Sequence, residues 1–108
     1  MTIEALMRSI EEGKQRGCSK FLIIDGISFS CMAAIQKFND SYKAHVCIIE
    51  ESKMASEEYK ELFTRSFSTL DEAIVCIDTY SLIKFNEFKI LKGHKVFDPE
   101  FDEENDTN

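Results

Sequence analysis

The sequence has few residues that break regular structure: four glycines stand apart from one another in 108 residues, with one proline and no tryptophan. Loops that bind phosphate need clustered glycines, because only glycine lets several backbone amides approach one anion. A nucleotide-binding enzyme is therefore not expected, and no cofactor is predicted.

Long hydrophobic runs are missing as well. The apolar segments stay far below the roughly 20 residues that a membrane-spanning helix needs. The first ten residues carry Glu4 and lack a basic leader followed by an apolar block, so no secretory signal is expected. These absences predict a soluble, cytoplasmic protein that does not bind a membrane.

Cysteine pairs of the CxxC type are also absent. The four cysteines are widely separated and lie inside apolar segments, at Cys18, Cys31, Cys47 and Cys76. Buried free thiols in a reducing compartment are the favoured interpretation, and disulfides are the alternative.

Most of the net charge of −7 lies at the C-terminal end of the chain. Residues 98–108 contain six acidic residues and no Lys or Arg, so residues 1–97 are nearly neutral. An acidic segment repels phosphate backbones and anionic lipid heads, which argues against nucleic acid as a partner. The composition predicts a single domain over residues 1–97 and an acidic disordered tail over residues 98–108.

Helical spacing of apolar residues predicts four helices. Thr2 is expected to cap the first, over residues 3–16, and Gly17 to end it. The last begins with a capping box, because Glu72 lies three residues after Thr69. The inward-facing residues of the four helices are Ile3, Leu6, Met7 and Ile10; Cys31, Ile35, Phe38 and Tyr42; Ala55, Tyr59, Leu62 and Phe63; and Leu70, Ala73, Ile74 and Ile77.

Two short apolar segments, residues 21–24 and 45–49, predict strands buried on both faces, and Phe67 predicts a short third strand. The alternation of helices and strands predicts an α/β fold, a small, mostly parallel open sheet flanked by about four helices. In this fold residues 22–24 and 46–49 lie on adjacent strands. Apolar residues on both sides of Lys92-Gly93 predict a hairpin over residues 87–97, and a helix through Phe88 is the alternative.

Carboxylates follow both predicted strands. Asp25 ends the first strand and Glu50 the second, so a parallel sheet would bring them to the same edge, where α/β folds bind ligands. Two close carboxylates bind a cation or split their pKa values. The favoured alternative is that each stabilises the N-terminus of the following helix.

Cysteine and histidine chemistry is weakly indicated. Cys31 lies where a strand would become a helix N-terminus, but His45 and His94 are far from it in sequence, so a packed thiol is favoured over a nucleophile. His45 and Cys47 share one face of a strand, and Cys18 or Cys31 would have to complete a zinc site. Neither a metal site nor a catalytic residue is predicted.

The order of segments from Ile3 to about Ile77 resembles the STAS family of bacterial anti-sigma-factor antagonists and the allied SpoIIAA-like domains. The resemblance rests on an amphipathic helix, on FLIIDGISFSCMAAI and HVCIIEE, and on the closing segment ELFTRSFSTLDEAI. In the family, the loop between strand and helix carries an Asp-Ser-Ser-Gly type motif whose hydroxyl is phosphorylated. Here the corresponding loop runs from Ser28 to Cys31 without that Asp or Gly, which puts a phosphorylation switch in doubt.

A second departure concerns the start of the chain. Family members begin with a β-hairpin, whereas this chain opens on the helix, so the hairpin predicted over residues 87–97 would fill the vacant sheet positions.

Three functions remain open. The first is a non-catalytic regulatory module that binds a protein partner through Ser28, Phe29, Ser30 and Met32, with Ser28 or Ser30 as a phosphorylation site. The second is a small enzyme or ligand-binding domain that uses Asp25 and Glu50. The third is a homodimer or larger symmetric assembly, in which an edge strand or exposed Phe residues pair with a second copy.

Overall fold

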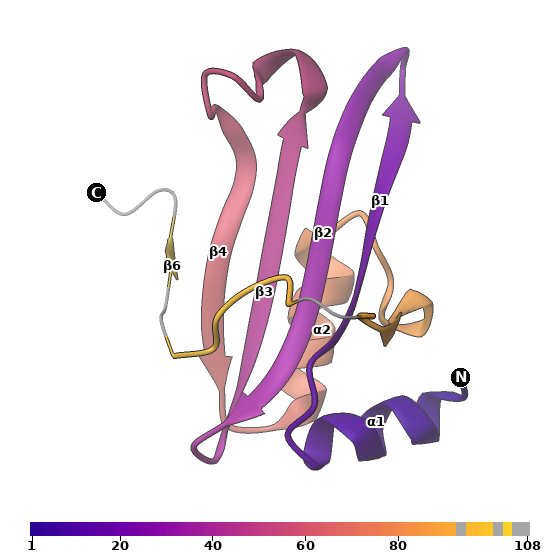
Figure 1. The fold of residues 1–108 in the computed structure, drawn as a ribbon, viewed down its shortest axis with the longest axis vertical. Helices are drawn as coiled ribbons and strands as arrows, with labels where there is room; N and C mark the ends of the chain where they lie inside the picture. Colours follow the sequence, from indigo (N-terminus) through magenta and orange to yellow (C-terminus); the bar gives the residue numbers. More distant parts are fainter. Residues whose placement is uncertain (93–94, 101–102, 105–108) are drawn as a thin grey trace.

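The computed structural model describes residues 1–92, 95–100 and 103–104, and these form one antiparallel sheet with two α-helices (Figure 1). The strand order is β5-β1-β2-β3-β4-β6. The elements are α1 (Ile3–Glu11), β1 (Arg16–Ile24), β2 (Ile27–Phe38), β3 (Ser41–Glu50), the 3-10 helix η1 (Glu51–Lys53), β4 (Tyr59–Phe67), α2 (Leu70–Tyr80), the 3-10 helix η2 (Phe85–Glu87), β5 (Lys89–Ile90) and β6 (Glu103–Glu104).

Two tight turns explain why the chain runs as a meander. Asp25 and Gly26 join β1 to β2 with φ values of 52° and 79°, and Asn39 and Asp40 join β2 to β3 with φ values of 52° and 65°. Two-residue turns with positive φ at both positions match the right-handed twist of antiparallel strands. Each turn therefore folds the chain back onto the strand that precedes it.

The predicted parallel α/β architecture is wrong. All strand pairs of the described sheet are antiparallel, and β2 lies between β1 and β3. Residues 22–24 and 46–49 are therefore not neighbours, although both segments are strands of one sheet. The chain makes tight turns where right-handed crossover helices were expected.

Two of the four predicted helices are strands. The segment with Cys31 and Ile35 is β2, in which Cys31, Ala33 and Ile35 alternate on the face that packs against the helices. The segment with Tyr59, Leu62 and Phe63 is β4, and only the short η1 precedes it. A strand with apolar residues on both faces also contains apolar residues three and four positions apart. The helical spacing in these two segments arose in this way.

The first and last predicted helices are confirmed, with their caps. Thr2 Oγ1 accepts a hydrogen bond from the Ala5 amide at 3.0 Å, and Thr69 and Glu72 form the reciprocal capping box at the start of α2. The first helix, however, ends near Gly13, whose φ is 91°. Gly17 lies in β1, where an added Cβ would be 2.4 Å from the Ala33 carbonyl oxygen.

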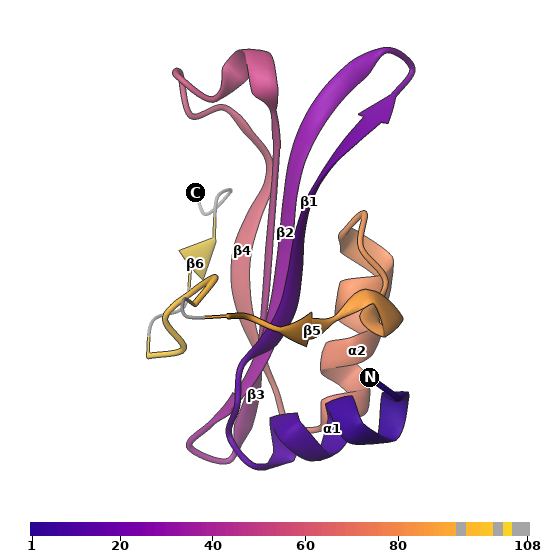
Figure 2. The same ribbon diagram turned by 45° about the vertical axis from the view of Figure 1, so that its right-hand side comes forward.

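The core lies between the helices and one face of the sheet. Both helices lie on that face, here called the helix face, whereas the segment after β5 crosses the opposite face, here called the back face (Figure 2). The helix-face core has Ile35, Val46 and Phe63 at its centre, and Leu6, Ile10 and Ile77 cover it from α1 and α2.

The C-terminal segment differs from the predicted hairpin. The chain forms η2 and then β5, which pairs with Arg16 and Gly17 of β1 and not with residues 96–97. Gly93 and His94 lie outside the described residues. In the predicted tail, Glu103 and Glu104 pair with Thr64 and Phe63 of β4 as β6, while residues 101–102 and 105–108 lie outside the described part.

Candidate protein-interaction site

Four large apolar side chains are exposed at the end of the β1–β2 hairpin, which extends past the helices (Figure 1). The exposed fractions are 66% for Phe21, 75% for Ile23, 41% for Ile24 and 42% for Ile27. These four residues are here called the hairpin end. Contiguous apolar residues at the surface are typical of interaction sites, because their contact with water is unfavourable.

The hairpin end presents apolar groups on both faces of the sheet. Phe21 and Ile23 point to the back face because side chains alternate along a strand. Ile24 and Ile27 are cross-strand partners on the helix face, beyond the reach of the core. A partner that binds the hairpin end can therefore cover apolar side chains on the helix face, on the back face, or on both.

The outer edge of β1 is free along most of its length. Within the described residues, β5 pairs only with Arg16 and Gly17, so no strand pairs with β1 from Ser19 to Ile24 on that side. Ile24 and Ile27 flank the two-residue turn and form its closing hydrogen-bonded pair, after which bonded and non-bonded pairs alternate. Ser19, Phe21 and Ile23 thus direct their backbone N–H and C=O groups away from β2.

The four partner-binding residues predicted from the sequence lie on β2 next to this edge, but on different faces. Phe29 faces the helices, opposite Leu22 and Glu50, whereas Ser28, Ser30 and Met32 face the back. All four are half-buried, and the Ser28 hydroxyl donates a hydrogen bond to Glu51 Oε1. None of them caps a helix, because β2 replaces the expected helix.

Asp25 and Glu50 are not cross-strand partners. Asp25 lies in the β1–β2 turn, whereas Glu50 on β3 lies opposite Phe29 of β2. The first two residues of β2, Ile27 and Ser28, lie between Phe29 and the turn. Glu50 Oε2 accepts a hydrogen bond from the Ser52 hydroxyl. Asp25 occupies the first turn position because aspartate tolerates a positive φ. The parallel sheet edge that was expected to bring the two carboxylates together is therefore absent from the described fold.

Glu50 instead borders a small hollow of about 360 Å³ near the end of the sheet. Two lysines and two glutamates line it, so their formal charges cancel. Its lining residues are Phe29, Glu50, Lys53, Glu58, Tyr59 and Lys60.

The sheet separates His45 from two of the cysteines that were considered for a zinc or thiol site, although His45 and Cys47 share one face as predicted. His45 lies on the back face, while Cys18 and Cys31 lie in the helix-face core. Burial raises the pKa of the Cys31 thiol, which disfavours the thiolate that a nucleophile needs. Among the described residues, no three or more His, Cys, Asp or Glu side chains are grouped to hold a metal ion.

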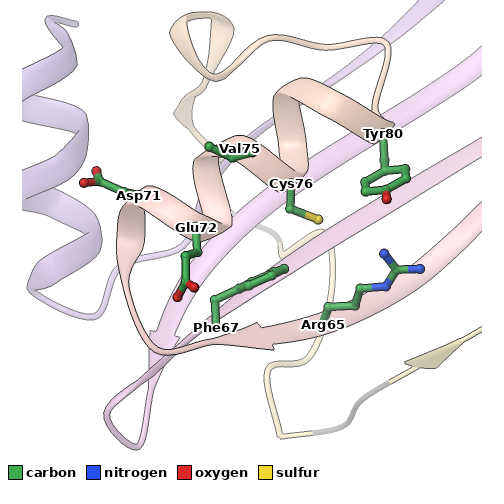
Figure 3. Close-up of a pocket in the computed structure, with 7 residues that line it drawn as sticks. All are labelled: Arg65, Phe67, Asp71, Glu72, Val75, Cys76 and Tyr80. Atoms are coloured by element: carbon green, nitrogen blue, oxygen red, sulfur yellow. The ribbon is translucent and has the colours of Figure 1, made fainter.

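A wider groove of about 480 Å³ runs between α2 and β4 (Figure 3). Phe67, Val75 and Cys76 line its middle, and Arg65 and Tyr80 lie at one end. The Arg65 guanidinium lies over the Phe63 ring at 4.1 Å and near the Tyr80 ring at 5.2 Å, so aromatic rings hold it in place. Asp71 and Glu72 border the other end, where Glu72 is engaged in the helix cap.

The sequence contained a signal for the hairpin end that helical spacing obscured. Asp25-Gly26 stands between two apolar segments, and Asp-Gly in this position is a strong hairpin signal. The sequence does not indicate that Phe21 and Ile23 are exposed, because a run of four apolar residues fits a strand buried on both faces as well as one with an exposed face.

No known protein family, curated protein or solved structure matches the chain. None of the helices in the described part of the chain has the length and hydrophobicity to cross a membrane. The resemblance to the STAS family stays a prediction that these comparisons do not test.

Proposed function

We propose that this protein is a non-catalytic regulatory module that binds a protein partner through the hairpin end. The observation that supports the proposal is the exposure of Phe21, Ile23, Ile24 and Ile27 together at one projecting end of the sheet. Interfaces between proteins are enriched in buried aromatic and apolar anchors at their centres.

The distribution of reactive groups supports binding over catalysis. His45 is buried and lacks a nearby acid among its described contacts, which are Thr64 and Phe97. Cys31 has a raised pKa and lies on the other face of the sheet. His45 and Cys31 are thus not placed beside each other in the way that nucleophilic catalysis requires.

A cytoplasmic location is part of the proposal. All four cysteines lie in the described part of the chain, are buried and remain outside disulfides. Buried reduced thiols are the usual state in a reducing compartment.

The test compares the proteins that the tagged wild type and two tagged variants capture from lysate of the cells that make this protein. Phe21→Lys combined with Ile23→Lys places charge on the hairpin end, and Val75→Lys places charge on a residue of α2 that is 62% exposed. We expect mass spectrometry to identify a partner retained by the wild type and by Val75→Lys, and lost from the double variant. A partner retained equally by the double variant contradicts the proposal.

A further inference from the structure

The free edge of β1 lacks the devices that normally prevent strands from pairing with other chains. Proteins protect such edges with proline, bulges or charged side chains. Between Ser19 and Ile24 the only charged residue is Lys20, and its ammonium group forms an ion pair with Glu87 of η2. The charge that could repel an incoming strand is therefore neutralised within the chain.

The side chains on this edge complement one another across a two-fold axis. An axis at Leu22, perpendicular to the sheet, would place Phe21 opposite Ile23 of the second copy. Phe21 and Ile23 are the residues whose backbone groups point outward, so each such pair would exchange two hydrogen bonds. An aromatic residue opposite a β-branched residue is also a favourable cross-strand pair.

The same register avoids repulsion between like charges. It places Lys20 opposite Ile24 and Ser19 opposite Asp25, where the serine hydroxyl can donate to the carboxylate. Within the acidic C-terminal segment, Glu103 and Glu104 form β6, which pairs with β4 at the other side of the sheet. Three strands, β2, β3 and β4, thus lie between β1 and these two glutamates.

We propose that the free edge of β1 binds a second copy of this chain, by antiparallel pairing of β1 with β1 about a two-fold axis at Leu22. The inference rests on the proposed function, because it uses the hairpin end as the interaction surface and names its occupant. Pairing joins two sheets into one and brings Phe21 of each copy into contact with Ile23 of the other on the back face. The contact is short, so we expect a dissociation constant in the range of roughly 1–100 µM.

The first experiment measures mass by sedimentation velocity over a concentration series from about 1 to about 500 µM, which spans this expected range. The wild type and Val75→Lys are expected to shift from monomer to dimer as concentration rises. Phe21→Lys combined with Ile23→Lys is expected to stay monomeric, with an unchanged circular dichroism spectrum. A wild type that is monomeric throughout overturns the inference, and so does a dimer lost only in Val75→Lys.

The second experiment tests the register. Leu22→Cys places two thiols across the axis in a non-hydrogen-bonded pair with Cα atoms about 4.5 Å apart, within the range of a disulfide. Mild oxidation is expected to give a covalent dimer on a non-reducing gel. The matched control, Ile24→Cys, faces Lys20 of the second copy and is expected to give none. Equal cross-linking of the two variants, or none in either, overturns the pairing at Leu22.

The two proposals fail in different ways. A wild type that remains monomeric, yet captures a different protein through Phe21 and Ile23, overturns the self-pairing and supports the proposed function. A dimer that forms through β1 while the double variant still captures every partner overturns the proposed function and supports the self-pairing.

Discussion

The imidazole ring of His45 stacks on the phenyl ring of Phe97, with ring centroids 5.1 Å apart and planes 4° from parallel. His45 lies on β3 at the back face, and its Nδ1 is 2.8 Å from Thr64 Oγ1 on β4. Phe97 belongs to the segment that crosses this face after β5. The stack therefore fastens the C-terminal segment to the centre of the sheet.

Burial lowers the pKa of His45 from 6.5 to about 4. Between these values the unfolded chain binds a proton at this residue and the folded chain does not, so stability falls as pH drops from about 6.5 to about 4. The full difference corresponds to about 3 kcal/mol. Chemical denaturation at several pH values measures this loss. The variant His45→Asn keeps a neutral polar group and is expected to lose less stability over this window; an identical pH dependence contradicts the assignment.

Gln15 fixes the same C-terminal segment through its side-chain amide. Its Oε1 accepts from the Val96 amide at 2.7 Å, and its Nε2 donates to the Phe97 carbonyl at 3.0 Å. Gln15→Ala leaves the half-buried Val96 amide and the buried Phe97 carbonyl without this partner, which is expected to cost about 2 kcal/mol of unfolding free energy. Amide hydrogen exchange at Val96 and Phe97 is expected to accelerate.

The matched control for Gln15 is Gln36→Ala. Gln36 accepts from Gln15 and donates to the Gly13 carbonyl, but it makes no described hydrogen bond to the C-terminal segment. Exchange at Val96 should therefore change little in this variant. Equal acceleration in both variants would show that Gln15 does not act as the specific clamp.

Gly17 is required by close packing between β1 and β2. A Cβ at this position would lie 2.4 Å from the Ala33 carbonyl oxygen and 2.7 Å from Ala34 Cβ. Gly17→Ala must displace backbone, so we expect a loss of about 3 kcal/mol or more in unfolding free energy. The control is Gly13→Ala, which meets no atom within 4 Å and pays only for its positive φ. Thermal unfolding that ranks Gly13→Ala as the more damaging change contradicts this account.

The capping box stabilises α2 by satisfying amides at its first turn. Thr69 Oγ1 accepts from the Glu72 amide at 3.2 Å, and Glu72 Oε1 accepts in return from the Thr69 amide at 3.2 Å. Thr69→Ala is expected to lower the unfolding free energy by about 1 kcal/mol. Ser68→Ala, which removes only a hydroxyl bonded to Glu72, should cost clearly less in urea titrations. An equal cost would place the stabilisation outside the N-cap.

Both α-helices were predictable because their signals are local. Thr2 and Thr69 lie at the position where a side-chain oxygen satisfies the first free amides, and the apolar spacing continues directly behind them. The two central strands, β2 and β3, have no comparable capping residue. β3 was nevertheless predictable, because its run of apolar residues is buried on both faces, beneath the helices and behind the C-terminal segment.

The strand β2 was read as a helix because residues 31, 35, 38 and 42 also fit helical spacing. The deciding signals were the pairs Asp25-Gly26 and Asn39-Asp40, whose residues tolerate the positive φ of two-residue turns. Reading both pairs as turns makes β1, β2 and β3 a meander and removes the parallel sheet. Without a parallel sheet, there is no reason to expect Asp25 and Glu50 at the same edge.

The candidate site was predicted only as a region of the chain. Ser28 to Met32 are next to the projecting edge, but the exposed anchors are Phe21 and Ile23 on the preceding strand. Which side chains of an apolar run are covered depends on where the helices end on one face of the sheet and on which strands the C-terminal segment crosses on the other. That is a property of tertiary packing, and residue spacing alone does not determine it.

The meander also has a consequence for how the chain folds. β1 to β4 each pair with the strand that follows or precedes them in sequence, whereas β5 and β6 join from the far end of the chain. Contacts between nearby segments form faster than contacts that close long loops. We therefore expect the four long strands to assemble first, as successive hairpins, and the segment holding Phe97 to dock in a later kinetic phase.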